Sequence, residues 1–322
     1  MAFKKQDVRF SAEGGIDLSG WLFTPDGTSR PVPGVTMAHG YAGTKYHGIE
    51  RMAEAFAAVG FAVLVHDHRG FGESGGEPRH DVNPWQQITD WRRAISFLQE
   101  RPEVDAERIG LWGTSYAGGH AIVLGATDRR LKAVVAQVPT IDGHAAGLRR
   151  VPPEGVAALE AMFAADERAQ LRGKPPASQV IVSAEASQVS SYKAADAVGF
   201  YLRPVPEGIW ENKVTVRSTR WARMYAPGEF IDRVSPTPLL MVVAEHDHIA
   251  VSDLALKAYE RALEPKRLTM IKGGHFDPYE AEFEAASEAA ISWFQRHLHS
   301  KNEGIIPTKG KTDVRIEMEN TD

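Results

Sequence analysis

The chain has 322 residues, 43% of them hydrophobic, and a formal net charge of −5 at pH 7. This length and composition predict one large globular domain, or a domain with an insertion. The negative charge and the lack of basic runs with interleaved aromatics speak against a nucleic-acid partner. Cysteine is absent, which excludes disulfides, thiol catalysis and Cys-ligated metals. The first residues lack the apolar core of a signal peptide, and no stretch approaches about 18 apolar residues. We therefore expect a cytoplasmic protein with no membrane partner.

Strands and helices are expected to alternate along most of the chain. Residues 8–13 and 17–25 alternate around Gly14-Gly15 and predict an opening hairpin. Continuous apolar strands alternating with helical stretches indicate a mostly parallel sheet with helices on both faces. The further predicted strands are 35–38, 61–65, 109–112, 132–138, 238–244 and 267–271, and the predicted helices are 49–59, 85–98, 116–125, 253–263 and 279–298.

Residues 141–230 interrupt this alternation. They contain two Pro-Pro pairs, a helical stretch at 156–171 and an aromatic-rich section. A long segment between two strands of a parallel sheet must run over the sheet edge, so we expect a helical cap above the active-site end; a surface decoration is the alternative. The predicted organisation is a core of residues 1–140 and 231–299, a cap of 141–230, and a polar tail of 300–322. Within the tail, 313–318 is a candidate for an edge strand or a dimer contact.

Ser115 is the main candidate for a reactive residue. It follows the apolar strand 109–112, sits on a turn of small residues and precedes the helix 116–125. This layout is typical of a nucleophile elbow, which exposes the serine hydroxyl and leaves the next backbone N–H free to face an oxyanion. The strict pattern is G-x-S-x-G, and Ala117 departs from it. The alternative role of Ser115 is a helix N-cap.

A serine nucleophile requires a histidine as base and a carboxylate to orient that histidine. His275 lies on a glycine loop between the last strand and the last helix, whereas His297 and His299 belong to the end of that helix. Two acids compete after the strand 238–244. Asp247 lies in the loop and Glu245 at the strand end. The order Ser, Asp, His is that of α/β-hydrolases, and we select Asp247 and His275.

The second oxyanion donor is expected in the loop after the first parallel strand. Gly40 allows a sharp turn there, and the N–H of Tyr41 would act together with the N–H of Tyr116. The Tyr41 hydroxyl is an alternative donor. We expect a structural role for His39, which precedes this turn.

Two paired histidines raise the question of a metal site. Residues 66–68 and 246–248 both read His-Asp-His, and side chains at i and i+2 of a strand share one face. Both pairs lie beside loops, and no further ligands cluster near them in the sequence. We expect no metal and no cofactor.

Together these residues resemble the α/β-hydrolase fold superfamily of serine hydrolases. The resemblance rests on His39-Gly40-Tyr41, the run Asp-His-Arg-Gly-Phe-Gly-Glu-Ser-Gly-Gly at 67–76, the elbow at Ser115, Asp247 and His275, and it covers about residues 5–299. It implies an eight-stranded sheet with an inserted cap.

Two branches of that superfamily are similar in detail. Ser115-Tyr116 with Tyr41 resembles the X-prolyl dipeptidyl-peptidase and cocaine esterase branch, in which a tyrosine hydroxyl completes the oxyanion hole. Residues 237–244 and 274–277 resemble the polyketide transferase group and its bacterial relatives, which implies hydrolysis or transfer of acyl groups.

We therefore expect a carboxylesterase acting on a small ester or acyl substrate, with a possible homodimer. Thioester hydrolysis, acyl transfer, lactone opening and C–C bond hydrolysis use the same triad, and a non-catalytic ligand-binding relative is the alternative of another class. Peptidase activity is disfavoured because no acidic pair is evidently placed to bind a substrate amine. The aromatic residues suggest an apolar pocket, for which the candidates are Trp112, Trp210, Trp221 and Tyr225.

Overall fold

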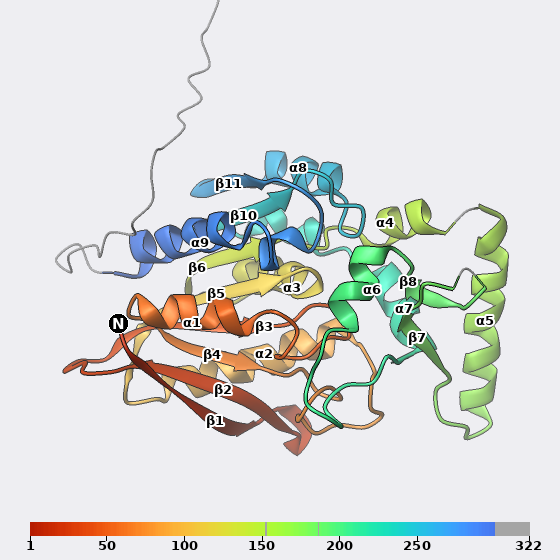
Figure 1. Ribbon diagram of the computed structural model, residues 1–322, viewed down its shortest axis with the longest axis horizontal. Helices are drawn as coiled ribbons and strands as arrows, with labels where there is room; N and C mark the ends of the chain where they lie inside the picture. The colour runs from red at the N-terminus through yellow and green to blue at the C-terminus, as the bar shows by residue number, and fades with distance from the viewer. Residues whose placement is uncertain (152, 186, 300–322) are drawn as a thin grey trace, which may run out of the picture.

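The computed structural model describes residues 1–151, 153–185 and 187–299, and an eight-stranded sheet forms its centre (Figure 1). The strand order is β1-β2-β4-β3-β5-β6-β10-β11. The strands are β1 (Phe3–Ser11), β2 (Asp17–Pro25), β3 (Val32–Ala38), β4 (Ala62–His66), β5 (Val104–Thr114), β6 (Leu131–Gln137), β10 (Leu239–Ala244) and β11 (Lys266–Ile271).

The sheet is mostly parallel, as the sequence predicts. Only β2 runs against its neighbours β1 and β4, and every other pair is parallel. The predicted hairpin joins β1 to β2 through a single turn of 3-10 helix, η1 (Glu13–Gly15), in which Gly14 and Gly15 have φ of 78° and 73°. Such positive φ values favour glycine.

Helices cover both faces of the sheet. α1 (Glu50–Ala58) and α9 (Phe283–Leu298) pack on one face, and α2 (Pro84–Gln99), α3 (Tyr116–Thr127) and α8 (Ser252–Arg261) belong to the other (Figure 1). The last helix begins later than the predicted residue 279. A short 3-10 helix, η3 (Asp277–Tyr279), with Pro278 inside it, precedes α9.

The segment between β6 and β10 builds a separate layer beside the carboxyl ends of the parallel strands (Figure 1). This layer, which we call the cap, contains the helices α4 (Gly143–Arg150), α5 (Pro153–Leu171), α6 (Ala195–Tyr201) and α7 (Val216–Met224). It also holds a small sheet, which was not expected, of β7 (Ser178–Val182), β8 (Ser190–Tyr192) and β9 (Val214–Thr215). These strands are short and rich in polar residues, so their pattern is weak in sequence. η2 (Pro227–Arg233) follows and packs against α3 and α8.

Hydrogen bonds and an ion pair connect the cap to the loops of the core. The hydroxyl of Tyr201 donates to the carbonyl oxygen of Tyr41 at 2.7 Å, and the indole N–H of Trp210 donates to the carbonyl oxygen of Ala42 at 2.8 Å. The guanidinium of Arg217 pairs with both oxygens of Asp81, at 2.8 and 2.9 Å. The first two contacts hold the loop that carries the predicted oxyanion donor.

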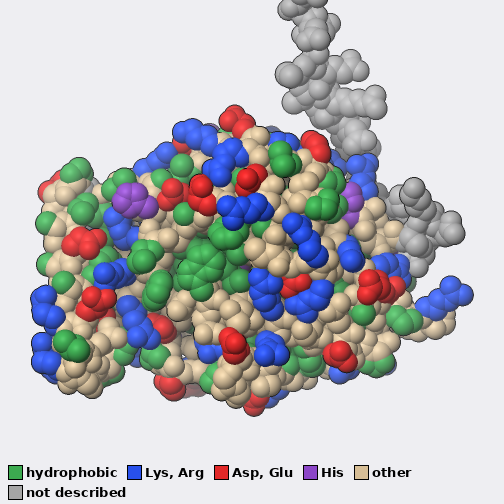
Figure 2. Space-filling view, turned by 180° about the vertical axis from the view of Figure 1, so that it is seen from behind, with side chains coloured by type: hydrophobic (Ala, Val, Ile, Leu, Met, Phe, Trp, Pro, Cys, Tyr) green, Lys and Arg blue, Asp and Glu red, His purple; other side chains and the backbone are tan. Residues whose placement is uncertain are grey.

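The surface mixes both signs of charge. Figure 2 shows Lys and Arg interspersed with Asp and Glu around a central group of hydrophobic side chains. Within the described part of the chain, no helix has the length and apolar character needed to cross a membrane. The tail 300–322, with the segment 313–318 predicted as an edge strand or dimer contact, lies outside the described residues.

Candidate active site

Ser115 occupies a strained turn between β5 and α3. Its φ of 56° and ψ of −119° lie outside the regions that a serine ordinarily adopts. The turn is tight enough that a Cβ at Gly113 would lie 2.1 Å from the carbonyl oxygen of Ala117. Glycine is therefore required two residues before the serine, whereas two residues after it the methyl group of Ala117 fits and is fully buried. The departure from the strict pattern leaves the elbow geometry intact.

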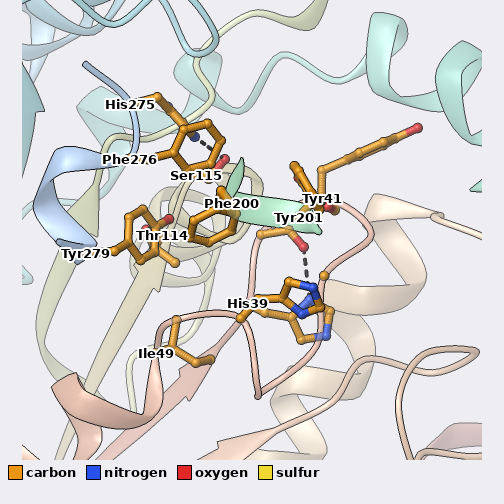
Figure 3. Close-up of a pocket in the computed structure, with 13 residues that line it drawn as sticks. His39, Tyr41, Ile49, Thr114, Ser115, Phe200, Tyr201, His275, Phe276 and Tyr279 are labelled. Carbon is orange, nitrogen blue, oxygen red and sulfur yellow. Dashed lines mark hydrogen bonds between the residues drawn. The ribbon is translucent and has the colours of Figure 1, made fainter. Parts of the chain in front are cut away.

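The hydroxyl of Ser115 does not cap the helix that follows it. α3 has no side-chain hydrogen bond at its N-cap, and the Ser115 Oγ lies instead 2.8 Å from the Nε2 of His275 (Figure 3). The other ring nitrogen, Nδ1, lies 2.7 Å from the Oδ2 of Asp247. The three side chains thus form one continuous chain of hydrogen bonds at the carboxyl ends of β5, β10 and β11.

Asp247 is held in its ionised form. Burial acts to raise its pKa, but the charge and hydrogen bond of His275 and two backbone donors outweigh burial and lower the pKa below 3.8. Those donors are the N–H groups of Ile249 and Ala250, both 2.8 Å from Oδ1. Glu245, the competing acid, has an exposed side chain. The structure therefore places Asp247, and not Glu245, against the imidazole.

The loop after β3 passes directly beside the serine. A Cβ at Gly40 would lie 2.9 Å from the Cβ of Ser115, so only glycine allows this approach. Among the hydrogen bonds of the described residues, neither the N–H of Tyr41 nor the N–H of Tyr116 has an acceptor. Two free backbone donors therefore flank the hydroxyl, as an oxyanion hole requires.

The hydroxyl of Tyr41 is directed elsewhere. Figure 3 shows the Tyr41 ring extending away from Ser115 and His275. Its hydroxyl is buried near Ser191 and Thr219 of the cap, and burial raises its pKa above the ordinary value. Of the two ways in which Tyr41 could serve an oxyanion, this arrangement favours the N–H.

Two cavities lie at the site, and Ser115 itself borders the smaller one. The smaller, of about 20 Å³, is bordered by Ser115, His275 and cap aromatics, including Phe200 and Tyr201. The larger, of about 340 Å³, lies under the cap and is bordered by both tyrosines of the predicted oxyanion hole. Its volume is in the range of small-molecule sites. Its lining also draws on α4, on β8 and on the residues just after Asp247.

The four predicted pocket residues line neither of these cavities. Trp112 is a core residue of β5, only 1% exposed, and Trp221 lies half-buried on α7. Trp210 covers the 41–47 loop from outside, with its ring 5.1 Å from that of His47. Tyr225 packs 5.2 Å from the ring of Tyr116 and hydrogen-bonds the Nδ1 of His120 at 2.8 Å. The cap aromatics that do line the cavities are Phe200 and Tyr201 in the smaller one and Tyr192 in the larger one.

The two pairs of histidines considered as metal ligands lie in different parts of the structure. His66 and His68 are buried in the core, and His246 and His248 are exposed at the cap. Within the described residues, no group of three or more His, Asp or Glu is arranged to hold a metal ion. His39 accepts a hydrogen bond from the backbone N–H of His68 at 3.1 Å, and therefore links the loops after β3 and β4.

Comparison with known proteins agrees with this architecture. Residues 14–277 match the family model described as X-Pro dipeptidyl-peptidase (S15 family). The chain belongs to this family. It is also 32% identical to the quorum-quenching protein AidA of Acinetobacter baumannii over 94% of this chain and 96% of that one. It is 28% identical to a thiohydrolase of Eupenicillium brefeldianum, over 88% of this chain and 92% of that one.

Solved structures give the same fold. The alpha/beta hydrolase GrgF from Penicillium sp. sh18 superposes with a TM-score of 0.80 at 28% identity, over 92% of this chain and 99% of that one. The sequence of polyketide transferase grgF from Penicillium sp. is likewise 28% identical, over 91% of this chain and 97% of that one. This S15-family chain is thus an α/β hydrolase, and the resemblance drawn from its motifs is confirmed.

The sequence predicts Tyr41 and Tyr116 of the larger cavity but misses its charged residues. Arg150 of α4 and Arg223 of α7 both border it. They are 73 positions apart in the sequence, lie in no motif and meet only because α4 packs against α7. No periodicity or spacing in the chain signals this convergence.

Proposed function

We propose that this protein is a serine hydrolase that cleaves a carboxylic ester or a related acyl bond through Ser115, His275 and Asp247. The observation that carries the proposal is the pair of hydrogen bonds centred on His275, at 2.8 Å to the serine and 2.7 Å to the aspartate. A serine and a carboxylate on opposite nitrogens of one imidazole are what nucleophilic catalysis requires.

In the proposed reaction, the Oγ of Ser115 attacks the substrate carbonyl carbon while the Nε2 of His275 takes the hydroxyl proton. The carbonyl oxygen becomes an oxyanion that accepts hydrogen bonds from the N–H groups of Tyr41 and Tyr116. Collapse expels the alcohol or thiol, which leaves with the proton from His275. Water then attacks the acyl-serine by the same route, and regenerates the hydroxyl as the acid product is released. Asp247 holds the imidazole in position and stabilises its positive charge.

The names of similar proteins bear on which acyl bond is cleaved. Two similar proteins carry the names thiohydrolase and polyketide transferase, so a thioester is the second candidate substrate, with transfer to an acceptor other than water as a variant. A peptide substrate with a free amine is less well supported. Among the described residues that line the larger cavity, none is an Asp or Glu that could pair with an ammonium group.

The experiment is to replace Ser115 with Ala and measure turnover of a panel of esters, thioesters and lactones. We expect kcat to fall roughly 10³-fold or more, because the members of a triad act together. The folded variant should also lose labelling by a fluorophosphonate probe. Turnover close to that of the wild type would contradict the assignment, and a wild-type protein inert to both probe and panel would support a non-catalytic ligand-binding relative.

A further inference from the structure

The larger cavity is positively charged. Its charged lining consists of Arg150, Lys193 and Arg223, and none of its described lining residues is Asp or Glu. The remaining lining is apolar or uncharged polar. It includes the hydroxyl groups of Ser190, Ser191 and Thr219, the amide of Gln179 and the imidazole of His248. The protein as a whole carries a net charge of −5. A cationic cavity is therefore a local feature and not a consequence of composition.

Arg223 is distinguished from the other arginines of α7. Arg217 pairs with Asp81, and Arg220 pairs with Glu167 on the outer side of the helix. Arg223 has no carboxylate or carbonyl acceptor among the described residues and borders the cavity. A half-buried guanidinium without an acceptor has unused hydrogen-bond donors in a fixed planar fork.

Helix α4 has a glycine, Gly147, where it contacts this side chain. A Cβ at Gly147 would lie 2.6 Å from the Nη1 of Arg223, so glycine at this position makes room for the guanidinium. α4 also supplies Arg150, whose Nη1 donates to the carbonyl oxygen of Ile249 at 2.7 Å. That bond uses one donor of Arg150 and ties the cavity to the loop that carries Asp247.

Lys193 and His248 contribute less to the argument. Lys193 has contacts of its own, and His248 lies 3.7 Å from the carboxylate of Asp196. The two arginines, by contrast, converge from neighbouring helices on a space beside the oxyanion tyrosines. Paired guanidinium groups next to hydroxyl donors are the arrangement that binds a carboxylate or a phosphate.

We propose that the natural substrate carries, besides its scissile acyl bond, an anionic group that binds Arg223 and Arg150. This inference rests on the proposed function, since the cavity is expected to hold the part of the substrate beyond the carbonyl held at Ser115. It makes the enzyme selective for acid-bearing esters or thioesters over neutral and amine-bearing ones.

The test compares kcat/KM for matched substrates that differ only in one terminal group. An acyl-side series consists of 4-nitrophenyl esters of six-carbon chains ending in a carboxylate, a phosphate, a methyl ester or an ammonium group. An alcohol-side series consists of hexanoyl esters of 4-hydroxybenzoate and of 4-hydroxybenzamide. We expect the anionic member of at least one series to exceed the neutral member by about tenfold or more, as charge-assisted hydrogen bonds provide. The carboxylate and phosphate arms identify which anion is preferred.

The variant that isolates the site is Arg223→Gln, which keeps a side chain of similar length but removes the charge. It should reduce the anionic-to-neutral ratio of kcat/KM about tenfold, mainly through KM, and Arg223→Lys should restore part of it. Arg220→Gln is the matched control, since Arg220 lies on the same helix but faces Glu167, and its ratio should equal that of the wild type. Circular dichroism melting curves check that each variant is folded.

The two proposals fail separately. Neutral esters turned over in a Ser115-dependent way, with a ratio near one in both series, would overturn the anion site and leave the hydrolase assignment standing. A preference that Arg223→Gln leaves unchanged would also overturn it. A lack of turnover of every substrate would contradict the proposed function instead. In that case the anion site is decided by whether adipate or 6-phosphohexanoate raises the melting temperature of the wild type more than that of Arg223→Gln.

Discussion

Ser115 is held in a backbone conformation that costs about 1–3 kcal/mol. The surrounding structure imposes it, because β5 ends and α3 begins on either side of this one residue. The strained turn directs the hydroxyl at the imidazole of His275 and leaves the N–H of Tyr116 without an acceptor. A residue that sequence reasoning also reads as an N-cap is therefore held in the geometry of a nucleophile.

The choice between two acids is testable at the same scale. Asp247→Asn should lower kcat by about 10²–10⁴-fold, because the amide cannot stabilise the imidazolium and favours the wrong tautomer of His275. Glu245→Gln is the control, since that side chain is exposed, and it should leave kcat within about twofold of the wild type. Steady-state kinetics on one good ester decide the matter. The assignment of the acid is wrong if Glu245→Gln is the more damaging change in folded protein.

At the scale of elements, the elbow depends on how closely a helix can approach a strand. The strict pattern G-x-S-x-G has its second glycine at position 117, where this chain has alanine. In the structure the closer approach falls one residue later, since a Cβ at Gly118 would lie 2.9 Å from the carbonyl oxygen of Gln137 on β6. Ala117, by contrast, is fully buried in the hydrophobic core, where its methyl group is accommodated.

We predict that Gly113→Ala destabilises the elbow severely. The added Cβ would meet the carbonyl oxygen of Ala117 at 2.1 Å, and backbone cannot move aside cheaply. We expect a loss of about 2 kcal/mol or more in the free energy of unfolding, measured in urea, together with lower activity. Ala117→Gly is the matched control, and should cost about 1 kcal/mol or less. Equal stability of the two variants would show that the turn can accommodate a Cβ at position 113.

At the scale of the whole molecule, a cluster of neutral histidines lies beneath the site. The rings of His39, His66, His68 and His120 are buried and stand edge to face, with His68 at 4.6, 5.4 and 5.7 Å from the other three. Burial, reinforced by repulsion from the His39 ring when that ring is protonated, lowers the pKa of both His66 and His120 from 6.5 to about 3.

This cluster predicts acid sensitivity. In the unfolded chain His66 and His120 take up protons below about pH 6.5, whereas in the folded protein both stay neutral to about pH 3. The contribution of these two histidines to stability is therefore fully present above pH 6.5 and is lost as the pH drops towards 3, by about 1.4 kcal/mol per pH unit for each of them. Urea unfolding between pH 7 and 4 measures this slope.

The matched variants are His66→Leu, in the cluster, and His144→Gln, which lies exposed on α4. The first should flatten the slope by about 1.4 kcal/mol per pH unit, and the second should leave it unchanged. A slope that His66→Leu does not alter would show that other groups cause the acid sensitivity.

The sequence by itself determined the elements of the core and their order, because buried parallel strands are continuous apolar runs and each helix has its own period. It also singled out Ser115, Asp247, His275 and the turn at Gly40-Tyr41, since each stands at a strand end where the fold needs a particular residue type. Only the tertiary structure brought these groups within hydrogen-bond distance, and gave the cap its small sheet. The tertiary structure also formed the larger cavity, which is proposed to hold the substrate. It is assembled from Arg150, Arg223 and hydroxyl groups that are far apart in the sequence and meet through helix packing, which leaves no local pattern.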